Sequence, residues 1–175
     1  AAFSCYPSPR GPCGRADDRT VTRVIELALF HVRIPLRRRV RHASYSRELS
    51  DNLIVRATLK NGVVGFGEGV PRSYVTGETI ESTIEQLIKT DFRPQLEAVA
   101  NFEQAVSVVS RMDLWQPHAD PRGGYGNAAR CAVELSLFDA YGKHFRQPLS
   151  HVTELVPEAS AIRQSVQRVR YSGAI

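Results

Sequence analysis

The dipeptide Asn61-Gly62 separates two short stretches of alternating sequence. An Asn-Gly pair adopts the two positive-φ positions of a tight type I′ turn at little cost, so this pattern is the strongest short-range signal for a β-hairpin. Residues 53–60 alternate as a strand before the turn, and residues 63–68 are predicted to return beside it. The hairpin therefore predicts an antiparallel sheet.

A further strand is predicted ahead of the hairpin. Residues 21–36 are rich in β-branched and aromatic side chains, and Pro35 interrupts regular pairing there. Together with the hairpin, this strand gives a three-stranded antiparallel meander. Residues 37–50 show neither the strand nor the helix period and are predicted to form a first loop, and residues 70–77 are predicted as a second.

Apolar residues at helical spacing follow the second loop. A first helix is predicted to open at Glu78, with Thr76 or Gly77 as its N-cap, and to end near Pro94. A second helix is predicted after Asn101, a good N-cap with a glutamine three residues later in a capping-box pattern.

A third helix is predicted to begin at the N-cap Asn127 and to end between Gly142 and Pro148. Cys131 falls inside this helix and is expected to be a small buried hydrophobe. Strands followed by helices indicate the α+β class, with a three-helix bundle on one face of the sheet.

The organisation predicted from composition has three parts. Residues 1–20 are rich in Pro, Gly and Arg without a period, and we expect them to be disordered. Residues 21–150 form the α+β domain, and residues 151–175 a linker with one more strand. The first residue is Ala1 rather than methionine and the last five lean apolar, so we expect a truncated chain.

The net charge of +5 is concentrated in one stretch, residues 33–47. Its basic residues are Arg33, Arg37, Arg38, Arg39, Arg41, His42 and Arg47. No apolar run approaches the roughly 20 residues that span a bilayer, and no secretory signal pattern is present. The three cysteines have no CxxC spacing, which argues against a cysteine zinc site and against a disulfide framework. A cytoplasmic location is expected.

The remaining polar residues show no catalytic or metal-ligand spacing. The histidines lack an HxxxH pattern, and no GxSxG elbow is present. Glu134 and Asp139 lie about 140° apart around the predicted third helix, so we expect them to form ion pairs rather than to share a metal. Glu68 is expected to pair with a nearby arginine or a backbone amide.

Three glycines, Gly65, Gly67 and Gly69, imitate a phosphate-binding loop. Pro71 follows them, however, and no helix starts directly afterwards, so the dinucleotide-binding geometry fails. Close backbone approach and a tight exit turn explain these glycines better.

Six local sequences occur in a characteristic order along the chain. They occupy residues 34–36, 52–56, 61–68, 76–79, 128–142 and 147–150. In this order and spacing the chain resembles, over roughly residues 21–175, the N-terminal capping domain of the mandelate racemase and muconate-lactonizing group of the enolase superfamily. Arg146 departs from the pattern, because the family often has glycine there.

The resemblance implies a cap over the mouth of a (β/α) barrel. In that family the barrel supplies a Lys-x-Lys pair and three carboxylates for Mg²⁺, which stabilises an enolate formed next to a substrate carboxylate. Cycloisomerases, dipeptide epimerases and o-succinylbenzoate synthases share this plan. The lysines here, Lys60, Lys89 and Lys143, form no such pair, and residues 170–173 match only the first barrel strand. No catalytic or metal residue is assigned, and the chain alone is predicted to be inactive and to need no cofactor.

What the resemblance does carry over is the two cap loops. Tyr45 and Arg47 on the first loop, and Arg72, Tyr74 and Thr76 on the second, are predicted to face a small carboxylate substrate in an intact enzyme.

Two alternatives stay open. The basic stretch could serve a non-enzymatic binding module, although nucleic acid is not the expected partner because the sheet is expected to lack exposed aromatic side chains for stacking. Alternatively, the chain is a truncated product that self-associates, because a cap without its barrel should expose an apolar face of its helices.

Overall fold

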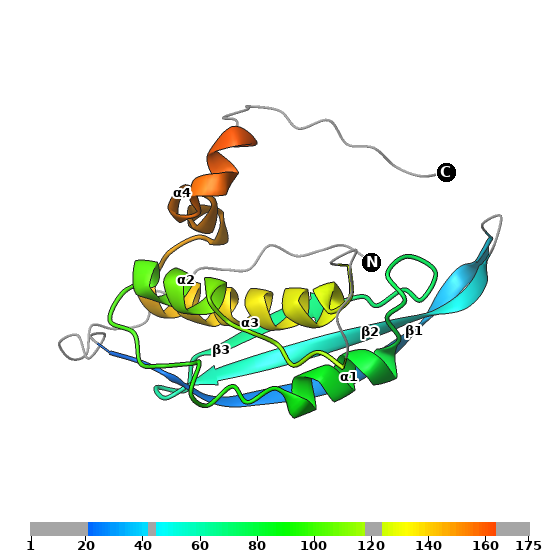
Figure 1. Cartoon of the computed structure of the whole chain (residues 1–175), viewed down its shortest axis with the longest axis horizontal. Coiled ribbons are helices and arrows are strands. Elements are labelled where there is room, and N and C mark those ends of the chain that lie inside the picture. The colour runs from blue at the N-terminus through cyan, green and yellow to red at the C-terminus, as the bar shows by residue number, and fades with distance from the viewer. Residues whose placement is uncertain (1–20, 42–44, 118–123, 164–175) are drawn as a thin grey trace.

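The computed structural model describes residues 21–41, 45–117 and 124–163. Three strands form one antiparallel sheet in the order β1-β2-β3 (Figure 1), and Asn61-Gly62 makes the turn between the last two. The hairpin is confirmed, but its turn is not the tight two-residue type, because Gly62 has a φ of 85° and Asn61 does not have a positive φ. Residues 60–62 form a three-residue loop in which the Gly62 amide donates to the carbonyl of Leu59 at 2.8 Å. The strands are β1 (Val24–Arg41), β2 (Ser46–Leu59) and β3 (Val64–Gly69).

Helices follow the strands, which confirms the α+β class. They are α1 (Ile80–Lys89), α2 (Phe102–Ser110) and α3 (Asn127–Phe145), then the short turns η1 (Leu149–His151), α4 (Val152–Leu155) and η2 (Pro157–Ala161). A linker was expected where these last turns lie. The predicted disordered segment 1–20 and the strand predicted within residues 165–175 lie outside the described residues.

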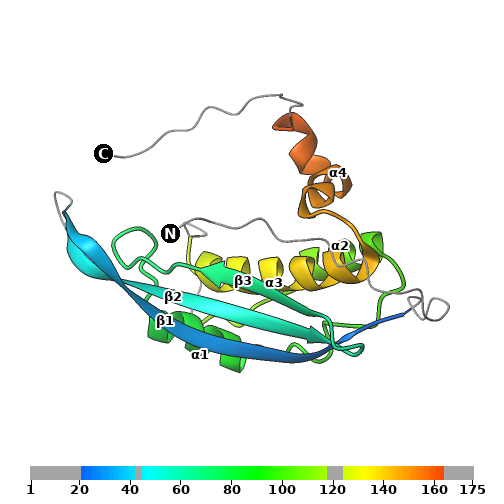
Figure 2. The same ribbon diagram turned by 180° about the vertical axis from the view of Figure 1, so that it is seen from behind.

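The prediction of a loop over residues 37–50 is wrong in most of its length. β1 continues to Arg41 and β2 already begins at Ser46, so the two strands form a long twisted arm beyond the rest of the sheet (Figure 2). A register shift between Pro35 and Val40 accommodates the proline, which cannot donate a ladder hydrogen bond, and pairing resumes at Val40 and Arg47. We call residues 34–41 and 45–51 the arm.

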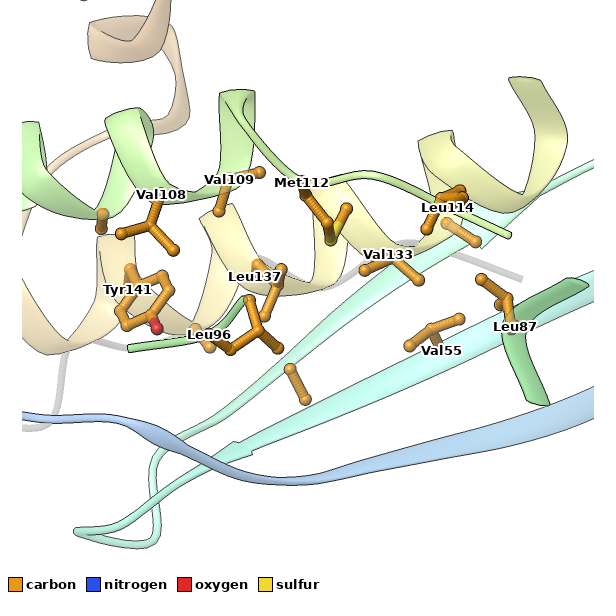
Figure 3. Packing of buried hydrophobic residues seen from close by; sticks show 14 of the residues in the cluster. Val55, Leu87, Leu96, Val108, Val109, Met112, Leu114, Val133, Leu137 and Tyr141 are labelled. Carbon is orange, nitrogen blue, oxygen red and sulfur yellow. The ribbon is translucent and has the colours of Figure 1, made fainter. Parts of the chain in front are cut away.

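The core lies between the sheet and the helices. Leu53, Val55, Ala57 and Leu59 alternate inward along β2 and are fully buried. Side chains of α3 pack above them, and α2 lies over α3 on the side away from the sheet (Figure 3). The helix layer therefore covers one face of the sheet, as predicted.

Helix α3 approaches β3 unusually closely. Gly65, Gly67 and Gly69 occupy the inner face of β3, each paired with an inward-facing residue of β2. A Cβ atom built on Gly67 would lie 2.5 Å from the backbone nitrogen of Ser136, and one on Gly65 would lie 2.8 Å from the Cα of Ala140. These glycines therefore give close backbone approach, and the partner is a helix.

Side chains of α3 also bond the open edge of β3. Lys143 Nζ donates to the carbonyl of Val64 at 3.1 Å, and the amide of Phe66 donates to Asp139 Oδ2 at 2.9 Å. Lys143 and Asp139 form an ion pair with each other, as expected for Asp139. An edge strand covered in this way does not offer its backbone to another chain.

Cys131 lies at the same edge of β3, and its predicted burial is wrong. The residue is exposed, and its Sγ contacts the carbonyl oxygen of Glu68 at 3.5 Å. Helical spacing alone could not predict its exposure, because α3 packs against both the face of the sheet and the edge of β3, and Cys131 lies on the side at the edge.

The caps of α1 and α2 differ in detail from prediction. α1 begins after Thr79, whose hydroxyl accepts from the Ser82 amide at 3.2 Å while the Ser82 hydroxyl accepts from the Thr79 amide at 3.0 Å. Thr76 and Gly77 are thus not its caps. For α2, Asn101 is confirmed as the N-cap, and the side chain of Gln104 accepts from Ala100 one residue earlier.

The outer face of the sheet is partly apolar. Phe30 and Phe66 are 43% and 51% exposed on this face, and the guanidinium of Arg56 lies 5.7 Å from the Phe30 ring. The expectation that the sheet lacks exposed aromatic side chains is therefore wrong. None of the helices in the described part of the chain has the length and apolar character to cross a membrane.

Substituting Gly67 with alanine tests the close approach of α3 to β3. The added methyl would overlap with the backbone of α3, so we expect Gly67→Ala to lower the free energy of unfolding by at least about 2 kcal/mol. Gly62→Asn is the matched control, because that turn position is open and asparagine tolerates its positive φ, giving a loss below about 1 kcal/mol. Urea denaturation measures both. Equal losses would contradict the proposed packing role of Gly67.

Candidate functional site

A polar cavity of about 290 Å³ lies between the arm, the second loop and the first turn of α1. Its lining residues are His31, Arg33, Tyr45, Arg47, Leu49, Asp51, Pro71, Arg72, Ser73, Tyr74, Glu78, Thr79, Ile80 and Glu81. Of the five predicted site residues, Tyr45, Arg47, Arg72 and Tyr74 line it. Thr76 does not.

Two aromatic rings join the arm to the second loop. Tyr45 and Tyr74 stack with their ring centroids 4.5 Å apart and their planes at 26°. Such a pair contributes about 1 kcal/mol beyond the area that it buries. The contact closes one side of the cavity between segments that are 29 residues apart in sequence.

Arg72 fixes the second loop against β2. Its guanidinium donates to the carbonyls of Pro71 and Asp51 at 2.9 and 3.3 Å and to Ser50 Oγ at 3.0 Å. The hydroxyl of Ser50 in turn donates to Asn52 Oδ1 at 2.6 Å. Arg72 was predicted as a substrate-facing residue, and much of its hydrogen-bonding capacity is used within the protein.

The same network reaches Glu68. The side-chain amide of Asn52 donates to Glu68 Oε1, so the partner of this carboxylate is an asparagine rather than the arginine or backbone amide that we expected. Asn52 is buried and pairs in register with Val32 of β1, a placement that no local pattern reveals.

A histidine, an arginine and an aspartate form a cluster at the base of the arm. Asp51 Oδ1 lies 2.7 Å from His31 Nε2 and 3.1 Å from Arg33 Nε. The hydrogen bond from His31, followed by the charge of Arg33, lowers the pKa of Asp51. We predicted no role for His31 and Asp51. Strand register was the missing signal, because Asp51 pairs directly with Arg33.

Arg47 is the charged residue of the cavity whose guanidinium keeps buried nitrogens without a partner. Its Nε and Nη1 atoms are buried from solvent, and neither has a hydrogen-bond partner among the described residues. By contrast, Arg39 on the same arm pairs with Glu48.

Glu78 links the second loop to α3. One carboxylate oxygen accepts from the amides of Gly126 and Ala128 at 3.1 and 3.0 Å, and the other accepts from the Thr76 hydroxyl at 2.6 Å. The prediction of Asn127 as the N-cap is wrong. Gly126 holds that position with a φ of 91° and no side chain, so the buried Glu78 satisfies the first amides of the helix instead.

No group of three or more histidine, cysteine, aspartate or glutamate side chains in the described residues could hold a metal ion. The acids that line the cavity have other partners: Asp51 bonds His31, and Glu78 bonds backbone amides. A second, larger cleft of about 580 Å³ runs along the start of β1 and holds none of the predicted site residues.

Comparisons with known proteins agree with this architecture. Residues 24–153 match the family described as "Mandelate racemase / muconate lactonizing enzyme, N-terminal domain". The N-succinyl-L-Arg/Lys racemase of Bacillus cereus is 30% identical over 131 residues, which make up 73% of this chain and 32% of the racemase. The L-Ala-D/L-Glu epimerase of Bacillus subtilis is 26% identical over 130 residues, 73% of this chain and 32% of the epimerase. The chain thus spans about a third of the length of these curated relatives.

Solved structures give the same result. The crystal structure of the Bacillus cereus racemase matches with a TM-score of 0.55 and 29% identity, covering 77% of this chain and 32% of the racemase. A dipeptide epimerase from Methylococcus capsulatus, complexed with Mg and the dipeptide L-Arg-D-Lys, matches with a TM-score of 0.56 and 24% identity over 75% of this chain and 34% of that protein. The second match shows the fold alone.

Substituting Glu78 tests its role as a cap for α3. Because Glu78→Ala leaves two buried amides unsatisfied and Thr76 without its acceptor, we expect it to lower the free energy of unfolding by about 2 to 3 kcal/mol. Glu78→Gln should cost about 1 kcal/mol, since one acceptor oxygen remains. The control is Glu85→Gln, which breaks only an exposed pair with Lys89 and should cost below about 0.5 kcal/mol. A Glu78→Ala loss no larger than that of the control would exclude the capping role.

The lowered pKa of Asp51 predicts a pH dependence. Its contribution to stability is present above the pKa of the unfolded chain, close to 3.8, and is lost as the pH falls through the lower folded pKa. Carboxyl ¹³C NMR should place the Asp51 midpoint below 3.8. Urea denaturation between about pH 5 and 2 should show a shallower acid loss in Asp51→Asn than in the natural sequence. Identical slopes would show that Asp51 does not contribute.

Proposed function

This chain belongs to the mandelate racemase/muconate lactonizing enzyme family, whose N-terminal domain it matches, and on that premise we propose that it closes the substrate pocket of an Mg²⁺-dependent enolase-superfamily enzyme. The reaction class is proton abstraction next to a carboxylate. Racemisation or epimerisation of a small amino-acid derivative or dipeptide is the favoured type, because both curated relatives are named for such reactions.

The cavity between the arm and the second loop carries this proposal. A cap that contacts part of a substrate needs two segments whose relative position is fixed and which have polar groups between them. The stacked pair Tyr45 and Tyr74 and the bonds from Arg72 to the backbone of β2 provide that relation here. Glu78 extends it to α3, the longest helix of the domain.

Within this function the residues of the chain bind, orient and exclude water, and the proton-transfer groups belong to the barrel. Lys60 lies at the hairpin, while Lys89 and Lys143 are paired with carboxylates on their own helices. Since none of them lines the cavity, no lysine here can act as the base. Mg²⁺, when bound in the intact enzyme, would stabilise the enolate. The acids of this cavity do not fit Mg²⁺, because hydrogen bonds occupy Asp51, Glu78 and Glu81.

A nucleic-acid-binding module fits the structure less well. In the basic stretch, Arg33 is paired with Asp51 and Arg39 with Glu48. On the outer face of the sheet, Arg56 beside Phe30 is paired with Glu26. These ion pairs lower the positive charge that a phosphate backbone would meet.

We predict that the 175-residue chain alone neither binds Mg²⁺ at a stoichiometric site nor exchanges the α-proton of N-succinylarginine in D₂O. The succinyl group of this probe ends in a carboxylate, so the probe carries an acidic distal group. Isothermal titration calorimetry and ¹H NMR measure the two properties. A chimera in which residues 24–153 replace the matching domain of the Bacillus cereus racemase should restore exchange, because the barrel then supplies the base and metal ligands.

Two variants of the chimera sharpen the test. Tyr74→Ala removes the stack between arm and loop and should lower kcat/KM by roughly 10-fold, while Lys60→Ala, at the hairpin, should leave it unchanged. A micromolar Mg²⁺ site on the chain alone would contradict the proposal. A folded, Mg²⁺-binding chimera without any exchange would contradict it equally.

A further inference from the structure

The charges that line the cavity are satisfied by the protein itself, with one exception. Arg33 pairs with Asp51, and Arg72 donates to two backbone carbonyls and a serine. Glu78 accepts from amides at the start of α3. Glu81 lies in the first turn of α1, where its own backbone amide and Thr79 lower the pKa of its carboxyl by hydrogen bonding. The exception is Arg47.

Two nitrogens of the Arg47 guanidinium are held away from water with their donors unused. Its Nε and Nη1 are buried and have no bonding partner in the described part of the chain. A guanidinium cannot lose its proton to relieve this cost, because the group stays protonated in proteins. An unpaired buried cation is strongly unfavourable, and the usual remedy is an opposite charge with acceptor oxygens.

The surroundings of Arg47 restrict what can supply that charge. The cavity of about 290 Å³ has room for a side-chain-sized group rather than a whole dipeptide. The stacked rings of Tyr45 and Tyr74 and the side chain of Leu49 are in its lining, which leaves space for a short carbon chain beside the cation. A basic ligand group would meet Arg47 and Arg72 unfavourably.

We propose that Arg47 binds a carboxylate at the distal end of the substrate, so that the enzyme acts on substrates with an acidic rather than a basic or apolar distal group. The assignment of the bound group to a substrate rests on the proposed capping function. Binding of a carboxylate by Arg47 is a property of the chain alone. Arg47 supplies the charge and its donors, and the Tyr45–Tyr74 stack and Leu49 flank the carbon chain.

NMR of the arginine Nε–H groups in the ¹⁵N-labelled 175-residue chain tests the proposal, with glutarate as the probe at constant ionic strength. The Arg47 resonance should shift saturably with a roughly millimolar Kd, the strength of a single charged contact. Uncharged glutaramide and 1,5-diaminopentane should leave it unchanged. Inorganic phosphate separates a carboxylate site from a general anion site, and an equal response to phosphate would overturn the carboxylate assignment.

Variants on the same arm provide the controls. Arg47→Met should abolish the response to glutarate, and Arg47→Lys should weaken it at least about 5-fold because lysine lacks the planar fork. Arg37→Met removes an exposed arginine of the arm and should bind as the natural sequence does. Absence of any Arg47 shift up to about 50 mM glutarate would overturn the proposal, as would unchanged binding by Arg47→Met.

Stability offers a second readout that does not depend on the NMR signal. Without ligand, Arg47→Met should be at least as stable as the natural sequence, because it removes two buried donors that lack a partner. Glutarate should raise the Tm of the natural chain and not that of the variant. Neither readout uses catalysis, so an inactive chimera with an intact Arg47 response would reject the capping function and keep the anion site.

Discussion

At three positions along strand β3, the backbone of helix α3 comes so close that only hydrogen fits on the strand's Cα atoms. Gly65, Gly67 and Gly69 provide those positions, and α3 meets them with the backbone atoms of Ala128, Ala132 and Ser136. The same helix also bonds the outer edge of β3 through Asp139 and Lys143. The glycine contacts and these bonds together fix the distance of α3 from the sheet and its orientation along β3. The remaining helices take their places relative to α3.

The geometry of the cavity between the arm and the second loop depends on the packing of α3 against β3. Glu78 holds the second loop to the first amides of α3, so the loop is positioned by a helix that the glycines have already placed. The arm reaches the same point from the sheet, as the continuation of β1 and β2. The sheet therefore positions Tyr45 on the arm, and α3 positions Tyr74 on the second loop. The two rings stack where these segments meet.

Several features of the site could not be predicted from sequence for identifiable reasons. The arm was predicted as a loop, because neither strand of residues 37–50 keeps an alternating pattern once both faces are exposed. Glu78 was predicted only to start α1. Its role as a cap of α3 could not be predicted, because its partners Gly126 and Ala128 lie some 50 positions further along the chain. Cys131 was predicted to be buried, because helical spacing does not reveal which side of a helix meets a strand edge.

The sequence by itself determined the kinds of element and their order. Turn chemistry at Asn61-Gly62, the alternation of β2 and the cap at Asn101 are local properties, and the chain obeys them. Sequence also located the two segments whose residues line the cavity. Only the tertiary structure decided which of those residues are used internally, as Arg72 is, and which keeps buried donors without a partner, as Arg47 does. That difference depends on strand register and helix placement, which bring together groups that lie far apart in the chain.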